Sequence, residues 1–116
     1  MINFEKLEVY QDSIVLATMI YNLTKKFPKE ELFGIVNQLR RASVSIALNI
    51  AEGSSRGRKE FAHFLDMARG SCYELVPLIR ISLDLKYITN EDYENSYASI
   101  SNLAMRISAL KNSLNR

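Results

Sequence analysis

Apolar side chains recur along this chain at alternating steps of about three and four residues, the spacing that places them on one side of an α-helix. Prolines, glycines and a capping pair interrupt the pattern at three places and divide it into four segments. The sequence therefore predicts four helices, over about residues 7–26, 28–54 and 58–86 and from residue 90 onward.

The boundaries rest on residues that stop or start helices. Pro28 cannot continue the first helix and suits the first turn of the second, which we expect to begin there. Small residues over 53–57 supply the next turn, and Thr89 with Asp92 forms a capping box for the last helix. Pro77 falls inside the third segment, where we expect it to kink the helix.

Four long helices joined by short links predict an all-α, up-down-up-down four-helix bundle. We expect it to be left-handed, with residues 1–116 as a single domain. If the second and third helices fold back on each other, Gly53 faces Phe61, so that a small residue meets a large one as close packing requires. We also expect the bundle to assemble with copies of itself as a homo-oligomer, because the second helix has an unusual surface.

The second predicted helix has too little polar surface to be covered along one seam only. No charged residue lies between Arg41 and Glu52, whereas an ordinary surface helix keeps one polar face. A second apolar set lies beside the main stripe, and we predict that it forms an oligomer interface: Val44, Ala47, Leu48 and Ala51. The alternative is a wide core face in a single compact bundle. The fourth helix also lacks charge between Glu94 and Arg106 and could add to the contact.

Polar residues in or near this zone are predicted to have structural rather than catalytic roles. Asn49 sits at a core position, where an amide needs hydrogen-bond partners and can fix the register of helices. Glu52 is placed to pair with Arg56 one turn later, or with another subunit. Arg41 is expected to lie near Glu74 of the third helix, as a surface or interface ion pair.

Composition places the chain among globular proteins with a weak positive charge. It has 116 residues, of which 47% are hydrophobic and 24% charged, and its formal net charge is +2. The single cysteine, Cys72, fits a reducing compartment. The longest uncharged run, 13–24, is shorter than the roughly 20 residues of a membrane span, and no signal peptide is evident at the start. We therefore expect a cytoplasmic protein without membrane association.

Candidate chemistry is sparse. Glu60 and His63 spell half of a di-iron carboxylate motif, but the chain has one histidine, so one subunit cannot complete that site. Cys72 lies on the core stripe and is expected to be packing. We therefore expect no catalysis, metal, cofactor or small-molecule substrate. The enzyme alternative is a small helical ribonuclease of the HEPN type, because Arg58 and His63 resemble its Arg-x4-His element.

Folding the bundle gathers basic residues at one end. Both termini and the turn between the second and third helices meet there, and basic residues outnumber acidic ones, whereas the other end is acidic. In a ring of parallel subunits this end would form a basic rim able to bind phosphate backbones. The candidate nucleic-acid-binding residues are Lys6, Arg56, Arg58, Lys59 and Lys111, with Arg116 at the same end. The alternative is ordinary solvation of helix ends.

Three blocks of sequence carry a family resemblance. The first is the opening run from Phe4 to Gln11, Phe-Glu-Lys-Leu-Glu-Val-Tyr-Gln. The second comprises residues 33–35, then 38–46 and 49–53, which end in Asn-Ile-Ala-Glu-Gly. The third consists of Glu60, Phe61, Phe64, Leu65, Ala68, Gly70, Ser71, Glu74 and Leu75. Together these blocks resemble the 23S rRNA-intervening-sequence proteins, a family of four-helix bundle proteins.

The resemblance implies a homopentameric ring of four-helix bundles, without established catalysis. Some bacterial genes of this family lie in insertions within 23S ribosomal RNA genes. The family name therefore describes where the genes lie and not what the proteins do. A related accessory protein of diversity-generating retroelements is a basic pentamer that binds nucleic acid and a reverse transcriptase. RNA or a nucleic-acid enzyme is therefore the implied partner. Two features depart from the family pattern and concern the third helix: Val76-Pro77, and Lys86 where a glycine is frequent.

Overall fold

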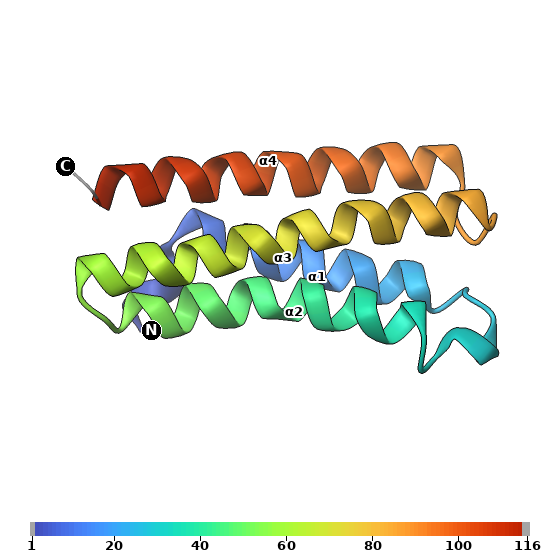
Figure 1. The fold of residues 1–116 in the computed structure, drawn as a ribbon, viewed down its shortest axis with the longest axis horizontal. Helices are drawn as coiled ribbons and strands as arrows, with labels where there is room; N and C mark the ends of the chain where they lie inside the picture. The colour runs from blue at the N-terminus through green and yellow to red at the C-terminus, as the bar shows by residue number, and fades with distance from the viewer. Residues whose placement is uncertain (1, 115–116) are drawn as a thin grey trace.

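The computed structural model describes residues 2–114 of the chain. Four α-helices account for most of these residues, with a short 3-10 turn before the first and another before the second. The elements are η1 (Asn3–Lys6), α1 (Glu8–Thr24), η2 (Lys29–Glu31), α2 (Ile35–Ser54), α3 (Arg58–Asp84) and α4 (Asn90–Leu114). Figure 1 shows the helices running up and down one long axis, with η1 and the end of α4 beside the α2–α3 turn.

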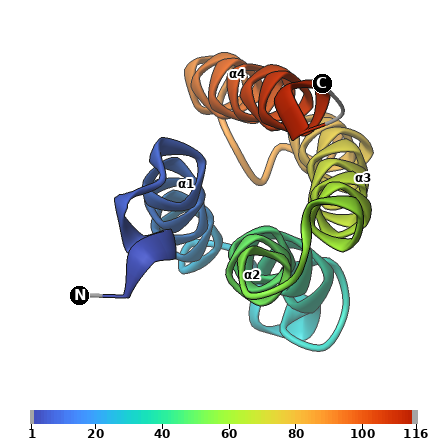
Figure 2. The ribbon, with the colours of Figure 1, turned by 90° about the vertical axis from the view of Figure 1, so that its left-hand side faces the viewer.

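Viewed along that axis, the four helices stand at the corners of a four-sided bundle (Figure 2). Each helix packs against its neighbours in sequence, and the contact between α1 and α4 is the weakest of the four between adjacent helices. The all-α class and the sequential packing of four helices, predicted from hydrophobic periodicity, are confirmed. Within residues 2–114, no helix is both long enough and apolar enough to cross a membrane.

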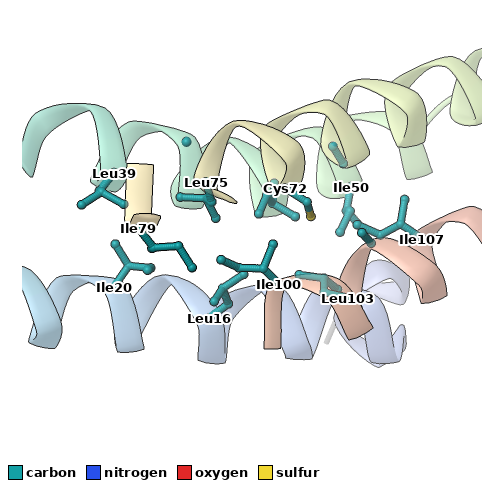
Figure 3. Close-up of a cluster of buried hydrophobic side chains, with 14 of the residues drawn as sticks. Leu16, Ile20, Leu39, Ile50, Cys72, Leu75, Ile79, Ile100, Leu103 and Ile107 are labelled. Carbon is teal, nitrogen blue, oxygen red and sulfur yellow. The ribbon is translucent and has the colours of Figure 1, made fainter. Parts of the chain in front are cut away.

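The core lies along the axis between the four helices. Its fully buried apolar side chains include Ile46 of α2 and Leu65 of α3. Figure 3 shows others: Leu16 and Ile20 of α1, Leu39 and Ile50 of α2, Leu75 and Ile79 of α3, and Ile100 and Ile107 of α4. Across the described chain, every buried side-chain nitrogen or oxygen has a hydrogen-bond partner. The stabilisation from burying apolar area is therefore not offset by unpaired polar groups.

Gly53 marks a very close approach of α2 to α3. An ideal Cβ built on Gly53 would lie 2.4 Å from Cβ of Phe64 and 3.0 Å from Cδ1 of Phe61. Any side chain at this position would therefore push the two helices apart. The predicted contact between Gly53 and Phe61 is confirmed, and Phe64 on the next turn comes closer still.

The predicted start of the second helix is wrong. Pro28 begins the 3-10 turn η2, and α2 begins only at Ile35. Gly34 precedes α2 with φ −107° and ψ −117°, outside the helical region, so the two segments cannot form one continuous helix. Leu32, expected on the core stripe, is 48% exposed. The error arose because Leu32 and Ile35 keep helical spacing across a break that glycine permits.

Beyond the C-terminus of α3, Lys86 takes a left-handed backbone conformation with φ of 64°. The amide of Tyr87 donates to the carbonyl oxygen of Ser82, and that of Lys86 donates to Leu83, both at 2.9 Å. These two bonds form a Schellman motif, in which glycine usually takes the left-handed position because it has no Cβ. Helix α3 continues through Pro77, so the proline does not end it, and the kink expected there stays a prediction.

Replacing Lys86 with glycine is expected to stabilise the protein by about 1 kcal/mol, since a left-handed backbone costs other residues roughly that much. Urea unfolding at one fixed protein concentration measures the change. Lys86→Ala is the matched control, because it also removes the lysine side chain but keeps the Cβ. An equal gain from both variants would assign the effect to the lysine charge instead of the backbone.

The N-terminus of α4 carries the predicted capping box. The amide of Asp92 donates to Oγ1 of Thr89 at 3.0 Å, and the amide of Thr89 donates to the Asp92 carboxylate at 3.1 Å. These reciprocal bonds satisfy amides that the helical ladder leaves free. The prediction of this helix start is confirmed.

Candidate functional site

The surface between α1 and α2 is apolar and open to solvent, and we call it the α1–α2 face. A groove of about 590 Å³ runs over it. Its apolar lining residues are Tyr21, Leu32, Phe33, Val36, Val44 and Leu48, and polar residues, Asn37, Arg40, Arg41 and Ser45, complete the lining. Phe33 is 92% exposed and Leu48 is 63% exposed. Contiguous apolar side chains this open to water are typical of a surface that a partner covers.

The residues predicted as an oligomer interface occupy different environments. Leu48 is exposed, whereas Ala47 is buried inside the bundle. Val44 is half-buried and lines the groove of the α1–α2 face. Ala51 is half-buried in a separate hollow beside η1. Because Ala47 is already covered within one chain, a contact between copies depends on Leu48 and Val44.

A second apolar surface, which we call the α3–α4 face, lies between α3 and α4. Its groove of about 680 Å³ has an apolar lining that includes Tyr73, Val76, Pro77, Tyr97 and Met105. Met105 is 68% exposed and Tyr73 57% exposed. Arg69 donates to the Tyr73 hydroxyl at 2.8 Å and its guanidinium lies over the Tyr73 ring, which holds this aromatic side chain at the rim.

The surface between α2 and α3 is a polar groove of about 530 Å³. Ser71 donates a 3.1 Å hydrogen bond to Ser45 across it, and the Asn49 amide donates to the Ser45 carbonyl and hydroxyl. Asn49 therefore finds hydrogen-bond acceptors on its own helix. Arg41 and Glu74 line this groove together, as their predicted proximity requires. They form no ion pair with each other among residues 2–114.

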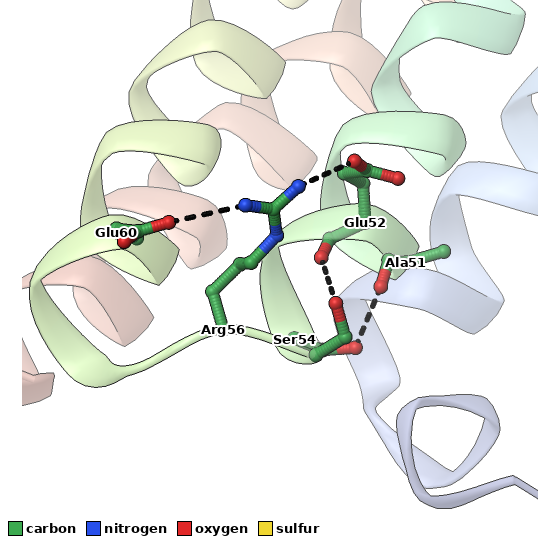
Figure 4. Close-up of polar contacts among 6 residues, drawn as sticks. Ala51, Glu52, Ser54, Arg56 and Glu60 are labelled. Carbon is green, nitrogen blue, oxygen red and sulfur yellow. Dashed lines mark hydrogen bonds and ion pairs between the residues drawn. The ribbon is translucent and has the colours of Figure 1, made fainter.

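At the end of the bundle that holds the α2–α3 turn, Arg56 lies between two carboxylates (Figure 4). Its guanidinium contacts Glu52 at 2.9 Å and Glu60 at 3.3 Å. The predicted pair with Glu52 is confirmed, and the hydrogen bond and charge of Glu52 raise the pKa of Arg56 above its ordinary value. A guanidinium already held by two carboxylates has little positive potential left for a phosphate.

Arg58 and Lys111 link α3 to α4 at the same end of the bundle. Arg58 donates to the carbonyl oxygens of Ser113 and Leu114, each at 3.3 Å. Lys111 pairs with Asp66 at 2.7 Å. Both cations therefore satisfy groups of their own chain, and the contacts of Arg58 complete carbonyls at the end of α4.

Lys6 and Lys59 are the two candidate nucleic-acid-binding residues whose charges remain available to a partner. Both side chains are exposed, and within the described chain neither forms an ion pair or a side-chain hydrogen bond. Arg116, predicted at the same end, lies outside the described residues. The basic surface of one chain is thus smaller than the sequence indicated, because Arg56, Arg58 and Lys111 are already bonded to carboxylates or carbonyl oxygens of the same chain.

His63 is exposed on α3. At about 100° per residue, the helix turns Arg58 and His63 roughly 140° apart, and Arg58 is already bonded to α4. The ribonuclease alternative gains no supporting contact and stays a prediction. Residues 2–114 contain no group of three or more side chains that could hold a metal ion.

Cys72 is completely buried in the core. Removal from water disfavours the thiolate and raises the pKa of Cys72 to about 12. The side chain is therefore a protonated thiol at neutral pH, as expected of a residue that serves packing and not nucleophilic chemistry.

Arg106 joins α4 to α1, and no pattern in the sequence predicted its role. Its guanidinium forms ion pairs with Glu8 and Asp12, both on α1. The pairs are far apart in sequence, so helical spacing could not reveal them. They connect the two adjacent helices with the weakest packing contact.

Comparisons with known proteins agree with this architecture. The family model described as "23S rRNA-intervening sequence protein" matches residues 5–109. A crystal structure from Bacteroides thetaiotaomicron, titled a protein with unknown function from the S23 ribosomal protein family, is similar at 25% sequence identity and a TM-score of 0.82. The similarity covers 90% of this chain and 95% of that one. Among curated proteins, none matches this chain.

Proposed function

Because this chain belongs to the 23S rRNA-intervening sequence protein family, we propose that it is a homo-oligomeric, non-enzymatic binding module whose basic end contacts RNA. The observation that carries the proposal is the exposure of Leu48, 63%, on a helix without charge between Arg41 and Glu52. The family resemblance supports five subunits in a ring, with a nucleic-acid enzyme as a further partner class.

Self-assembly accounts for apolar side chains that one chain leaves in water. Complete burial of a leucine or phenylalanine side chain contributes about 1.5–3 kcal/mol. Leu48 and Phe33 are both mostly exposed in one chain, and a second copy would remove them from water. A wide core face, the alternative considered from the sequence, explains Ala47 but leaves Leu48 unexplained.

The nucleic-acid part of the proposal depends on assembly. One chain has a formal net charge of +2, and its open candidate cations at the basic end are Lys6 and Lys59. Copies arranged in parallel around a ring would repeat these lysines on one rim. Each phosphate that such a rim neutralises adds to the affinity and to its dependence on salt.

Leu48→Arg is expected to reduce the assembly to smaller species, because a buried contact would then have to accommodate an unpaired charge. Native mass spectrometry and light scattering at matched concentration measure the subunit number. Ile81→Arg is the control, since Ile81 is also an exposed apolar residue, 48% open, but lies in neither apolar groove. A wild-type protein that is already a single chain would contradict the proposal.

The double variant Lys6→Glu with Lys59→Glu is expected to lose RNA retention in low salt while keeping its fold and subunit number. The matched control is Lys25→Glu with Lys26→Glu, which makes the same charge change at the opposite end of α1. Binding to a mixed-sequence RNA, measured by filter retention at several salt concentrations, distinguishes them. Equal losses in both double variants would show a general charge effect, and no loss in either would contradict the assignment of RNA contact to Lys6 and Lys59.

A further inference from the structure

We propose that copies of this chain meet head to tail, with the α1–α2 face of one copy covering the α3–α4 face of the next. In this contact Arg41 of one copy pairs with Glu74 of the other. The inference rests on the self-assembly proposed above and states which surfaces meet and how the copies are oriented.

The two apolar faces are different surfaces on opposite sides of the bundle. Along the bundle axis, the helices follow one another around the four corners, so the α1–α2 and α3–α4 sides face away from each other (Figure 2). A two-fold dimer joins a face to its own copy and would leave the second face in water. A head-to-tail contact covers both faces in every copy that has two neighbours.

The faces also match in position along the bundle. The hydrogen bond between Ser45 of α2 and Ser71 of α3 sets the level of the two helices. Because the helices are antiparallel, Leu48 and Val44 lie level with the stretch of α3 that lines the α3–α4 groove. A parallel copy placed alongside therefore brings the faces together without a shift along the axis. A contact without axial shift favours closure into a ring over growth of a helical filament.

One pair of opposite charges, Arg41 and Glu74, lies near the edges of the two faces. The other charged residues that line the two grooves, Arg40 and Arg69, lie over Tyr21 and Tyr73 of their own chain. Arg41 lines the groove of the α1–α2 face and also the polar α2–α3 groove. Glu74 lines that polar groove beside Pro77, which reaches into the groove of the α3–α4 face. When parallel copies lie side by side, α2 of one runs along α3 of the other, and these two charges meet at about the same level. Both are exposed, and neither has an ion-pair partner within residues 2–114.

The area available fits a specific contact. Aromatic side chains present about 150–250 Å² each when fully open, so Phe33, Tyr73 and Tyr97 at their observed exposures add roughly 100–200 Å² apiece. With Leu48 and Met105, each face offers on the order of 400 Å² of apolar surface, about half of the 800 Å² per partner of a standard interface. The polar groups around each groove supply the remainder, as they do in other interfaces.

Mixing two variants tests the head-to-tail arrangement. Leu48→Arg blocks the α1–α2 face and Met105→Arg blocks the α3–α4 face, so each variant alone is expected to be a single chain. Their equimolar mixture retains one intact pair of faces and is expected to form one-to-one heterodimers, detected by native mass spectrometry. If the wild-type protein is an oligomer but the mixture of variants stays as single chains, the head-to-tail arrangement is overturned. A wild-type single chain would instead overturn the self-assembly beneath it.

Charge reversal provides an independent test, because Arg41 and Glu74 are exposed and lie outside the core. Arg41→Glu and Glu74→Arg are each expected to weaken assembly by about tenfold, because like charges then face each other across the contact. Mixing the two variants restores opposite charges at the contact only if the pair lies between copies. Stronger assembly in the mixture than in either variant alone supports the proposal, and recovery confined to the double variant within one chain would overturn the intermolecular pair.

Discussion

Gly53→Ala is expected to destabilise the protein by about 2 kcal/mol, although alanine is the better helix former. The added methyl would lie 2.4 Å from Cβ of Phe64. That atom is attached directly to the backbone, so it cannot move aside by a change of rotamer, and α2 and α3 must separate. Urea unfolding at fixed protein concentration measures the loss.

Gly70→Ala is the matched control for this prediction. Gly70 also lies inside a helix, but a Cβ added there meets no atom within 4 Å. The same substitution should therefore stabilise the protein by about 0.5–1 kcal/mol through helix propensity alone. A gain at Gly53 similar to that at Gly70 would mean that α2 and α3 are less tightly packed than the structure shows.

Ile79→Ala is expected to destabilise the protein by about 3 kcal/mol, with a fall in Tm of more than about 10 °C. Ile79 has no exposed surface and belongs to the buried apolar cluster between the helices (Figure 3). Shortening it removes buried methyl groups and leaves a cavity that close-packed neighbours fill only in part.

Ile81→Ala provides an internal comparison on the same helix. Ile81 is 48% exposed, so the identical substitution removes few contacts, and the change in helix propensity favours alanine. We expect its free energy of unfolding to stay within about 0.5 kcal/mol of the parent protein. Comparable losses at both positions would contradict the assignment of Ile79 to the core and Ile81 to the surface.

The helices could be predicted because their signals are local. The three-four repeat of apolar residues requires no knowledge of the other helices, and the capping box of Thr89 with Asp92 lies within one turn. The prediction for the segment after Pro28 was wrong because the hydrophobic pattern does not register where the helix is interrupted. A break at Gly34 leaves the hydrophobic spacing intact, so the pattern alone cannot distinguish a 3-10 turn from the start of a helix.

Some features of the candidate surfaces could likewise be predicted from local sequence, whereas others depend on contacts between helices. The absence of charged residues around Leu48 is visible in the sequence, and the pair of Glu52 with Arg56 follows from helical spacing. The pair of Lys111 with Asp66 joins different helices, so its effect on the basic end could not be foreseen. The exposure of Phe33 also depends on how the turn around η2 leaves the bundle.

The weak seam between α1 and α4 has a consequence for the order in which the bundle folds. Most contacts join helices that follow one another in the chain, and such contacts form with short loops and little entropy loss. The first and last helices must instead find each other across the whole chain. Arg106 with Glu8 and Asp12 is their polar link. We therefore expect the bundle to grow by successive hairpins and to close last at α1 and α4, where hydrogen exchange should also report the earliest opening.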